Sequence, residues 1–79
     1  AYVANQVDNN VSVIDTNSNT VVATVPVGNN PFGVAITPDG SFAYVTNFNI
    51  ANVSVIDTSS NTVVTTVPVG ISPFGVAIK

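Results

Sequence analysis

The chain contains 79 residues, with four aspartates and a single lysine, which gives a formal net charge of −3. Nucleic-acid-binding proteins use clusters of lysine and arginine, so the composition excludes that class. The same lack of cations argues against a polybasic helix on a membrane surface. The chain also has no cysteine and no histidine. This absence excludes a disulfide framework, a zinc site and histidine-dependent catalysis.

The first 19 residues alternate between short apolar runs and polar turns. Residues 2–5 and 11–15 are predicted to form strands, because valine, isoleucine and tyrosine favour an extended backbone. Residues 6–10 and 16–19 are rich in asparagine, serine and threonine. Because these short polar side chains bond nearby backbone groups, both segments are predicted to be turns or loops.

Two more strands are predicted before the next turn. Residues 20–25 are β-branched at five of six positions, which favours a strand over a helix. Residues 26–32 contain two prolines and a glycine, so this segment is expected to leave the sheet. Residues 33–37 form the next strand, and residues 37–40 (Thr-Pro-Asp-Gly) are a turn in which proline presets φ and glycine accepts a left-handed backbone.

The whole pattern then repeats with a period of 42 residues. Residues 1–37 and 43–79 differ at ten positions and are identical at the other 27, without a gap. No segment shows the apolar period of a helix. The eight predicted strands are residues 2–5, 11–15, 20–25, 33–37, 43–47, 53–57, 62–67 and 75–78.

We therefore predict an all-β fold built from two four-stranded antiparallel β-propeller blade units. A repeat of about 40–45 residues that holds four strands is the spacing of a propeller blade. Several strands are apolar on both faces, as expected for a sheet that lies between two neighbours. Residues 1–42 would form the first blade repeat and residues 43–79 the second, together part of one propeller-type domain.

Two blades alone leave an apolar face uncovered on each side. At about 25 cal/mol per Å² of apolar surface, a few hundred Å² of uncovered face forfeits several kcal/mol. We expect the pair to be completed by further blades of a longer chain or by copies of itself. The chain begins and ends inside repeat units, so Gly75–Ile78 of one copy could complete the sheet begun by Tyr2–Asn5 of the next, giving a ring or a filament.

The repeat closely resembles the YVTN β-propeller repeat of archaeal and bacterial surface-layer and secreted proteins. The resemblance covers the chain twice and includes the Thr-Pro-Asp-Gly turn; the first copy departs from it, with Ala4 in place of threonine. In the second copy it rests on Tyr44-Val45-Thr46-Asn47, on Val53-Ser54-Val55-Ile56-Asp57-Thr58, on residues 61–70 and on Pro73-Phe74-Gly75-Val76-Ala77-Ile78.

The resemblance implies a propeller of about seven blades, an extracellular or cell-surface location and a structural or adhesive role, with no shared catalytic residue. We therefore predict a non-enzymatic structural module, without cofactor or metal, that stacks with further blades or self-associates. No run of residues is long and apolar enough for a membrane helix. The alternative is a fragment of a ligand-binding or catalytic propeller whose active residues lie outside this chain.

The four aspartates are expected to act in turns rather than in a catalytic pair. Asp15 and Asp57 end equivalent strands and are predicted to bond the turn that follows each strand. Asp39 belongs to the Thr-Pro-Asp-Gly turn, and Asp8 is expected to be a solvated loop residue. A calcium site at Asp8 or Asp15 is the alternative, but no series of alternating oxygen ligands accompanies either residue.

The aromatic side chains suggest either core packing or a platform for stacking sugars. Five of them occupy fixed places in strands or strand entries, so core packing is predicted for Tyr2, Tyr44, Phe32, Phe42 and Phe74. Phe48 differs because it replaces Gln6 in a loop. It is expected to be an exposed contact or to cover the edge of a blade.

Asn10 and Asn52 are the candidate N-glycosylation sites. Each begins an Asn-Val-Ser sequon, and each is expected to be accessible because a loop enters a strand there. The two sequons count as one observation, since the repeat duplicates them. The abundance of asparagine, serine and threonine offers chance as the other explanation.

Overall fold

The computed structural model describes all 79 residues and contains seven strands and no helix. It therefore has no helix that could cross a membrane. The predicted all-β class is confirmed. The strands are β1 (Tyr2–Asn5), β2 (Asn10–Asp15), β3 (Thr20–Pro26), β4 (Pro31–Ile36), β5 (Phe42–Asn47), β6 (Asn52–Asp57) and β7 (Thr62–Pro68).

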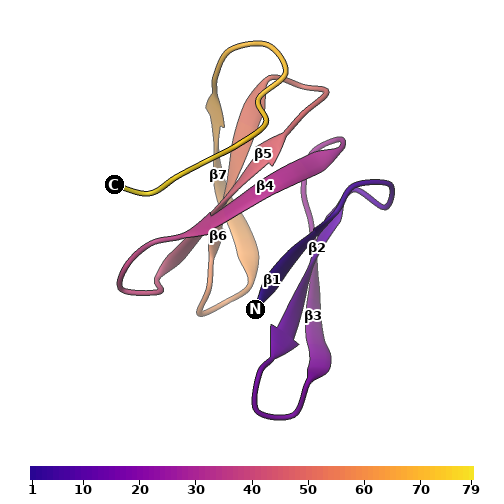
Figure 1. Cartoon of the computed structure of the whole chain (residues 1–79), viewed down its shortest axis with the longest axis vertical. Coiled ribbons are helices and arrows are strands. Elements are labelled where there is room, and N and C mark those ends of the chain that lie inside the picture. The colour runs from indigo at the N-terminus through magenta and orange to yellow at the C-terminus, as the bar shows by residue number, and fades with distance from the viewer.

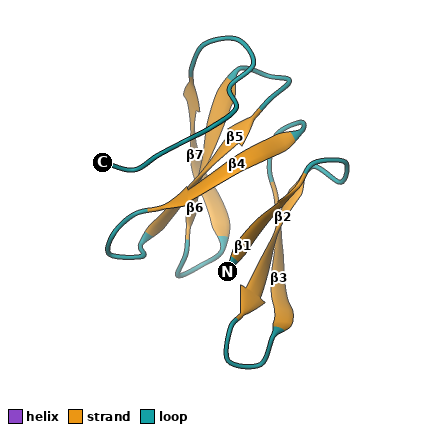
Figure 2. Ribbon diagram, in the orientation of Figure 1, coloured by secondary structure: helices purple, strands orange, loops and turns teal.

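The strands form two antiparallel sheets that lie face to face (Figures 1 and 2). The first sheet has the order β1-β2-β3, and the second has the order β4-β5-β6-β7. The chain passes from one sheet to the other through residues 27–30, next to Pro26, where the sequence predicts that it leaves the sheet. β4 therefore belongs to the second sheet, although its sequence lies within the first 42 residues.

Equivalent strands of the two sheets pair in the same register. Val11 lies opposite Val25 in the first sheet, as Val53 lies opposite Val67 in the second. Both outer pairs also carry a bulge at the same place, between Val13 and Ile14 and between the equivalent residues of β6. The sequence repeat is thus a structural repeat at the level of single hydrogen-bonded pairs.

Asparagines at left-handed backbone positions help to close the turns. Asn19 and Asn61 have φ of 56° and 54° in the turns that follow β2 and β6. Asparagine tolerates this conformation better than most residues. Before β2 the same conformation is taken by Asn9, at φ 59°, whereas before β6 it is taken by Ala51, at φ 51°.

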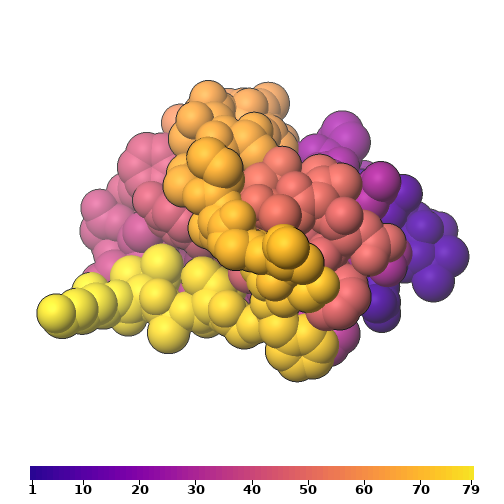
Figure 3. All heavy atoms as spheres, turned by 90° about the horizontal axis from the view of Figure 1, so that it is seen from above, coloured from indigo at the N-terminus to yellow at the C-terminus, as the bar shows by residue number.

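The predicted eighth strand, residues 75–78, is not formed. Residues 73–79 carry no ladder pairing and run across the second sheet (Figure 1); Figure 3 shows this yellow segment along the outside of the molecule. The equivalent residues in β4 pair with β5. In the second sheet, which residues 73–79 cross, the edge of β5 is already occupied by β4, so no equivalent edge is free there.

Candidate functional site: the interface between the sheets

The core of the molecule lies between the two sheets. Small aliphatic side chains of β2, β3, β5 and β6 meet there, and in β2 and β5 they come from alternate positions, as the two-residue period of a strand requires. Six side chains, none more than 7% exposed, form one cluster: Val11, Val13 and Val25 of the first sheet and Ala43, Val45 and Ile56 of the second.

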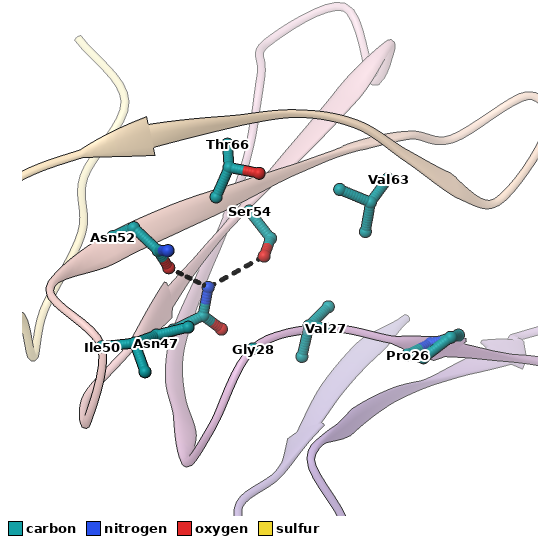
Figure 4. A pocket seen from close by; sticks show the side chains of 9 residues that line it. All are labelled: Pro26, Val27, Gly28, Asn47, Ile50, Asn52, Ser54, Val63 and Thr66. Atoms are coloured by element: carbon teal, nitrogen blue, oxygen red, sulfur yellow. Dashed lines mark hydrogen bonds between the residues drawn. The ribbon is translucent and has the colours of Figure 1, made fainter.

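A buried asparagine fixes the end of β5 in this interface. The Asn47 Nδ2 group donates to Asn52 Oδ1 at 2.7 Å and to Ser54 Oγ at 2.8 Å (Figure 4). Asn47 is 0% exposed, and its Oδ1 has no hydrogen-bond partner. Asn5 makes the same pair of bonds in the first sheet, to Asn10 Oδ1 and Ser12 Oγ, but it is only half-buried.

A cavity of about 260 Å³ opens beside Asn47, where the link from β3 passes the second sheet. The backbone comes very close to Asn47 at this point. A Cβ atom on Gly28 would lie 2.7 Å from Asn47 Cγ and 2.5 Å from Ile50 Cδ1, so no larger residue fits there without displacement. Figure 4 shows the lining residues Pro26, Val27, Gly28, Asn47, Ile50, Asn52, Ser54, Val63 and Thr66.

Thr46 acts on the opposite face of the second sheet. The ladder between β4 and β5 is irregular from Pro31 to Val34, and there the Gly33 N–H donates to Thr46 Oγ1 at 2.8 Å. The same hydroxyl donates to the Phe74 carbonyl, also at 2.8 Å. Thr46 therefore joins β4 to the chain segment that crosses the outside of the sheet.

A tyrosine connects the first sheet to a turn of the second. Tyr2 donates its hydroxyl hydrogen to Asn61 Oδ1 at 2.7 Å. Burial raises the pKa of this phenol, and the negative charge of Asp57 raises it further. The hydroxyl therefore stays protonated, and available as a donor, throughout the neutral range.

The prediction that the strand aromatics pack in the core is wrong for three of the five. Phe32, Phe42 and Phe74 are 42%, 37% and 55% exposed. Phe32 and Phe74 stack on each other with ring centroids 3.8 Å apart, and Phe48 meets the edge of Phe74 at 6.1 Å. These rings gather outside the core because the crossing segment brings Phe74 onto β4 and no further layer covers it.

The outer faces of the two sheets carry the same residue types as the interface but leave some of them uncovered. Val45 is 0% exposed between the sheets, whereas its equivalent Val3 is 44% exposed on the free face of the first sheet. On the other side, Val25 is 2% exposed and its equivalent Val67 is 42% exposed. A Cβ on Gly70, the equivalent of Gly28, would meet nothing within 4 Å. Each free face is thus one half of an interface whose complete form lies inside the molecule.

The structure places the two sequon asparagines in the first positions of β2 and β6. Both are half-buried rather than fully accessible, because the Oδ1 atom of each accepts a hydrogen bond from the neighbouring strand. Asn52 also lines the cavity between the sheets. Asn10 occupies the equivalent place on the free face of the first sheet.

No group of three or more carboxylates, histidines or cysteines comes together. The turn role predicted for Asp15 and Asp57 is confirmed: they accept from the backbone N–H groups of Asn17, at 2.8 Å, and Ser59, at 2.9 Å. Hydrogen bonds from Ser59 hold the pKa of Asp57 below its usual value. Asp8 is exposed in its loop, as expected.

Sequence reasoning did not identify the hydrogen bonds of three residues of the repeat motif, Asn47, Thr46 and Tyr2. The partners of Asn47 lie in the next strand, whereas those of Thr46 and Tyr2 become visible only when distant segments of the chain are brought together. One signal was available, since Ala4 stands where the second repeat has Thr46. Of these groups, Tyr2 alone connects the two sheets, while Asn47 and Thr46 fix strands and segments of the second sheet.

Two antiparallel sheets stacked face to face, with equivalent faces left open on both sides, define a segment of a β-propeller. The family comparison agrees, because the model of the YNCE-like beta-propeller family matches residues 1–79. The chain belongs to this family, which is consistent with the YVTN-type repeat read from the sequence.

Two longer proteins contain segments that are similar to this chain. The hydrazine synthase of Kuenenia stuttgartiensis contains a similar structure, with a TM-score of 0.92 and 34% identity over 94% of this chain and 21% of its own. The PE-PGRS family protein PE_PGRS18 of Mycobacterium tuberculosis strain H37Rv is 54% identical over 37 residues, which are 47% of this chain and 8% of the relative. The chain thus spans about a fifth or less of either protein.

Proposed function

We propose that this chain is a non-enzymatic structural module whose function is to stack with further blades, either in a longer polypeptide or by self-association. The observation that carries the proposal is the difference in exposure between equivalent residues. Val3 and Val67 stand open on the two outer faces, while Val45 and Val25 are covered in the interface between the sheets. Covering such apolar surface contributes about 25 cal/mol per Å².

A cell-surface or extracellular location belongs to the same proposal. It is supported by the resemblance to surface-layer repeats and by the single lysine without arginine, which leaves few sites for trypsin-like proteases. Glycans at Asn10 and Asn52 would fit this location. The intact mass of the native material tests the modification, and an unmodified peptide that spans both asparagines would end that part of the proposal.

Sedimentation velocity of the purified chain at increasing concentration tests the stacking. We expect oligomers whose share grows with concentration, and a Tm that rises with it, because association stabilises the folded state by mass action. Images of the oligomers would distinguish a closed ring from a filament. A folded monomer with a constant Tm across the concentration series would overturn the proposal of self-association.

A second candidate function is a part of a catalytic or ligand-binding propeller whose working residues lie on other segments. The observation in its favour is that the similar solved structure is named as an enzyme, hydrazine synthase. The two candidates differ in what a complete propeller would hold in its centre. A cluster of polar, titratable side chains there would favour the second candidate, and a lining of small residues such as Gly33 and Ala35 would favour the structural module.

A further inference from the structure

We propose that residues 73–78 of one copy of this chain form the missing fourth strand beside β1 of a second copy, and that Ala4 makes this joint weaker than the joint inside the chain. The proposal rests on the stacking function above and specifies its contact. It concerns one surface, the free edge and free face of the first sheet, and one occupant, another copy of this chain.

Both halves of the joint are present in the chain, and both lack a partner. β1 is the edge of the first sheet, whereas its equivalent β5 is paired on both sides, by β4 and β6. Residues 73–78 have the same sequence as β4, Pro-Phe-Gly-Val-Ala-Ile, but pair with no strand. An unpaired strand edge presents free N–H and C=O groups that an extended segment can complete.

The pairing of β4 with β5 gives the register of the proposed joint. Within the chain, Val34 lies opposite Val45 and Ile36 lies opposite Ala43. The 42-residue repeat transfers these pairs to residues that are identical in type. In the joint between copies, Pro73 would lie opposite Asn5, Val76 opposite Val3, Ala77 opposite Tyr2 and Ile78 opposite Ala1.

The placement of β4 indicates how a second copy would dock. β4 pairs within the second sheet while it also packs against β1 of the first sheet. Residues 73–78 already lie on the second sheet in the corresponding way, held by the bond from Thr46 to the Phe74 carbonyl. A second copy can therefore dock on the second sheet as that sheet docks on the first. Docking would also cover Val3, which is 44% exposed in the single chain.

The new joint would lack two contacts that the internal joint has. Thr46 Oγ1 accepts from the Gly33 N–H at the irregular part of the β4–β5 ladder. At the joint between copies, the side chain of Ala4 has no hydroxyl to accept from the N–H of Gly75. Next to Gly28 the internal joint has the Ile50 methyl group. Its equivalent in the first sheet is Asp8, a carboxylate. Both changes favour reversible association over permanent closure.

Disulfide trapping tests the register, and the chain has no native cysteine to interfere. Residues directly opposite each other in an antiparallel pair have Cβ atoms about 4.5–5.5 Å apart, close enough for a disulfide to form with small adjustments. A mixture of the Val3→Cys chain and the Val76→Cys chain should give a cross-linked dimer that contains one of each. The matched control mixes Val3→Cys with Ile78→Cys, which lies two residues out of register.

The expected result is a heterodimer in the first mixture and little product in the control. Equal yields in both mixtures, or only dimers of a single variant, would overturn the proposed joint. If the unmodified chain associates while the first mixture gives no heterodimer, the stacking function stands and this joint is wrong. A chain that stays monomeric overturns this joint together with self-association, and leaves stacking within a longer polypeptide as the remaining form of the proposed function.

The role of position 4 is tested by Ala4→Thr, with sedimentation as the readout. The added hydroxyl would accept from Gly75 of the neighbouring copy, so the dissociation constant should fall about fivefold, the effect of one net hydrogen bond. Thr46→Ala is the matched control, because it should loosen the second sheet of each chain without tightening the joint. An unchanged or larger dissociation constant for Ala4→Thr would overturn this role.

Discussion

At the scale of single residues, asparagine performs two different tasks in this molecule. Asn19 and Asn61 adopt the left-handed backbone of a turn, and Asn47 uses its amide to bond two side chains of the next strand. Both tasks use its short side chain and paired donor and acceptor. The Asn-rich composition therefore reflects the number of strand ends that need either a turn or a cross-strand bond.

Ala51 departs from this scheme, and its replacement should stabilise the fold. Ala51 has φ 51°, while the equivalent Asn9 also accepts a hydrogen bond from the Asn30 N–H. A left-handed backbone costs an ordinary residue about 1–2 kcal/mol. We expect Ala51→Asn to raise the free energy of unfolding by about 1 kcal/mol, because asparagine bears this backbone more easily.

Urea unfolding followed by circular dichroism would measure the gain. Asn9→Ala is the reciprocal control and should lose a similar amount, together with the bond to Asn30. A destabilising effect of Ala51→Asn would show that the left-handed backbone at this position is not the dominant cost.

At the scale of elements, the strands follow from local sequence, except for the last one. Runs rich in β-branched residues between polar turns predict β1 to β7 to within a few residues, because such runs favour an extended backbone by themselves. Residues 75–78 have the same local preference as β4, yet they form no strand. A strand is defined by its ladder, and whether a partner edge is free depends on the whole arrangement of the sheet.

The turns give the protein a dependence on acid pH. Hydrogen bonds from Ser41 and Thr37 hold the pKa of Asp39 low, and those from Ser59 do the same for Asp57. The unfolded chain therefore binds protons more readily, since a free aspartate has a pKa of about 3.9. The stabilisation is complete above that value and is lost as the pH falls through the lower pKa values of the folded state.

We expect the urea midpoint to decrease below about pH 4 and to decrease less in the double variant Asp39→Asn, Asp57→Asn. Asparagine keeps an oxygen that can accept the turn hydrogen bonds but does not titrate. The measurement is a set of urea unfolding curves at several pH values for both proteins. Identical pH profiles would show that these two carboxylates do not contribute to acid sensitivity.

At the scale of the whole molecule, one interface is complete and two equivalent faces are at least partly open. The repeat itself predicted the stacking, since identical residues in successive sheets must meet similar surroundings. It did not predict the contacts that align the sheets, such as Tyr2 with Asn61. Those contacts join residues almost sixty positions apart, and their geometry depends on how far the sheets are rotated and offset.

Alanine substitutions at two equivalent glycines should distinguish the closed interface from the open face. Gly28→Ala should destabilise the single chain by about 1–3 kcal/mol, because the new methyl group would overlap with Asn47 and Ile50. Gly70→Ala should change the unfolding free energy by less than about 0.5 kcal/mol, since nothing lies near it. Neither glycine has a positive φ, so the comparison isolates the steric effect.

Unfolding curves at low protein concentration would measure both values. At higher concentration, Gly70→Ala should weaken association, because Gly70 would approach a second copy as Gly28 approaches the second sheet. Equal losses for the two variants in the dilute chain would contradict the assignment of closed and open faces.

Because β1 lies at the edge of its sheet, an engineered chain with its segments in a different order could supply the missing fourth strand itself. A circular permutant that starts at Pro73 and joins Lys79 to Ala1 through a Pro-Asp-Gly-Ser-Phe linker would carry the fourth strand of the first sheet on the same polypeptide. Strand exchange between molecules would then be unnecessary, while the apolar outer faces would remain. Comparing its assembly with that of the parent chain would separate the contribution of backbone pairing from that of face-to-face contact.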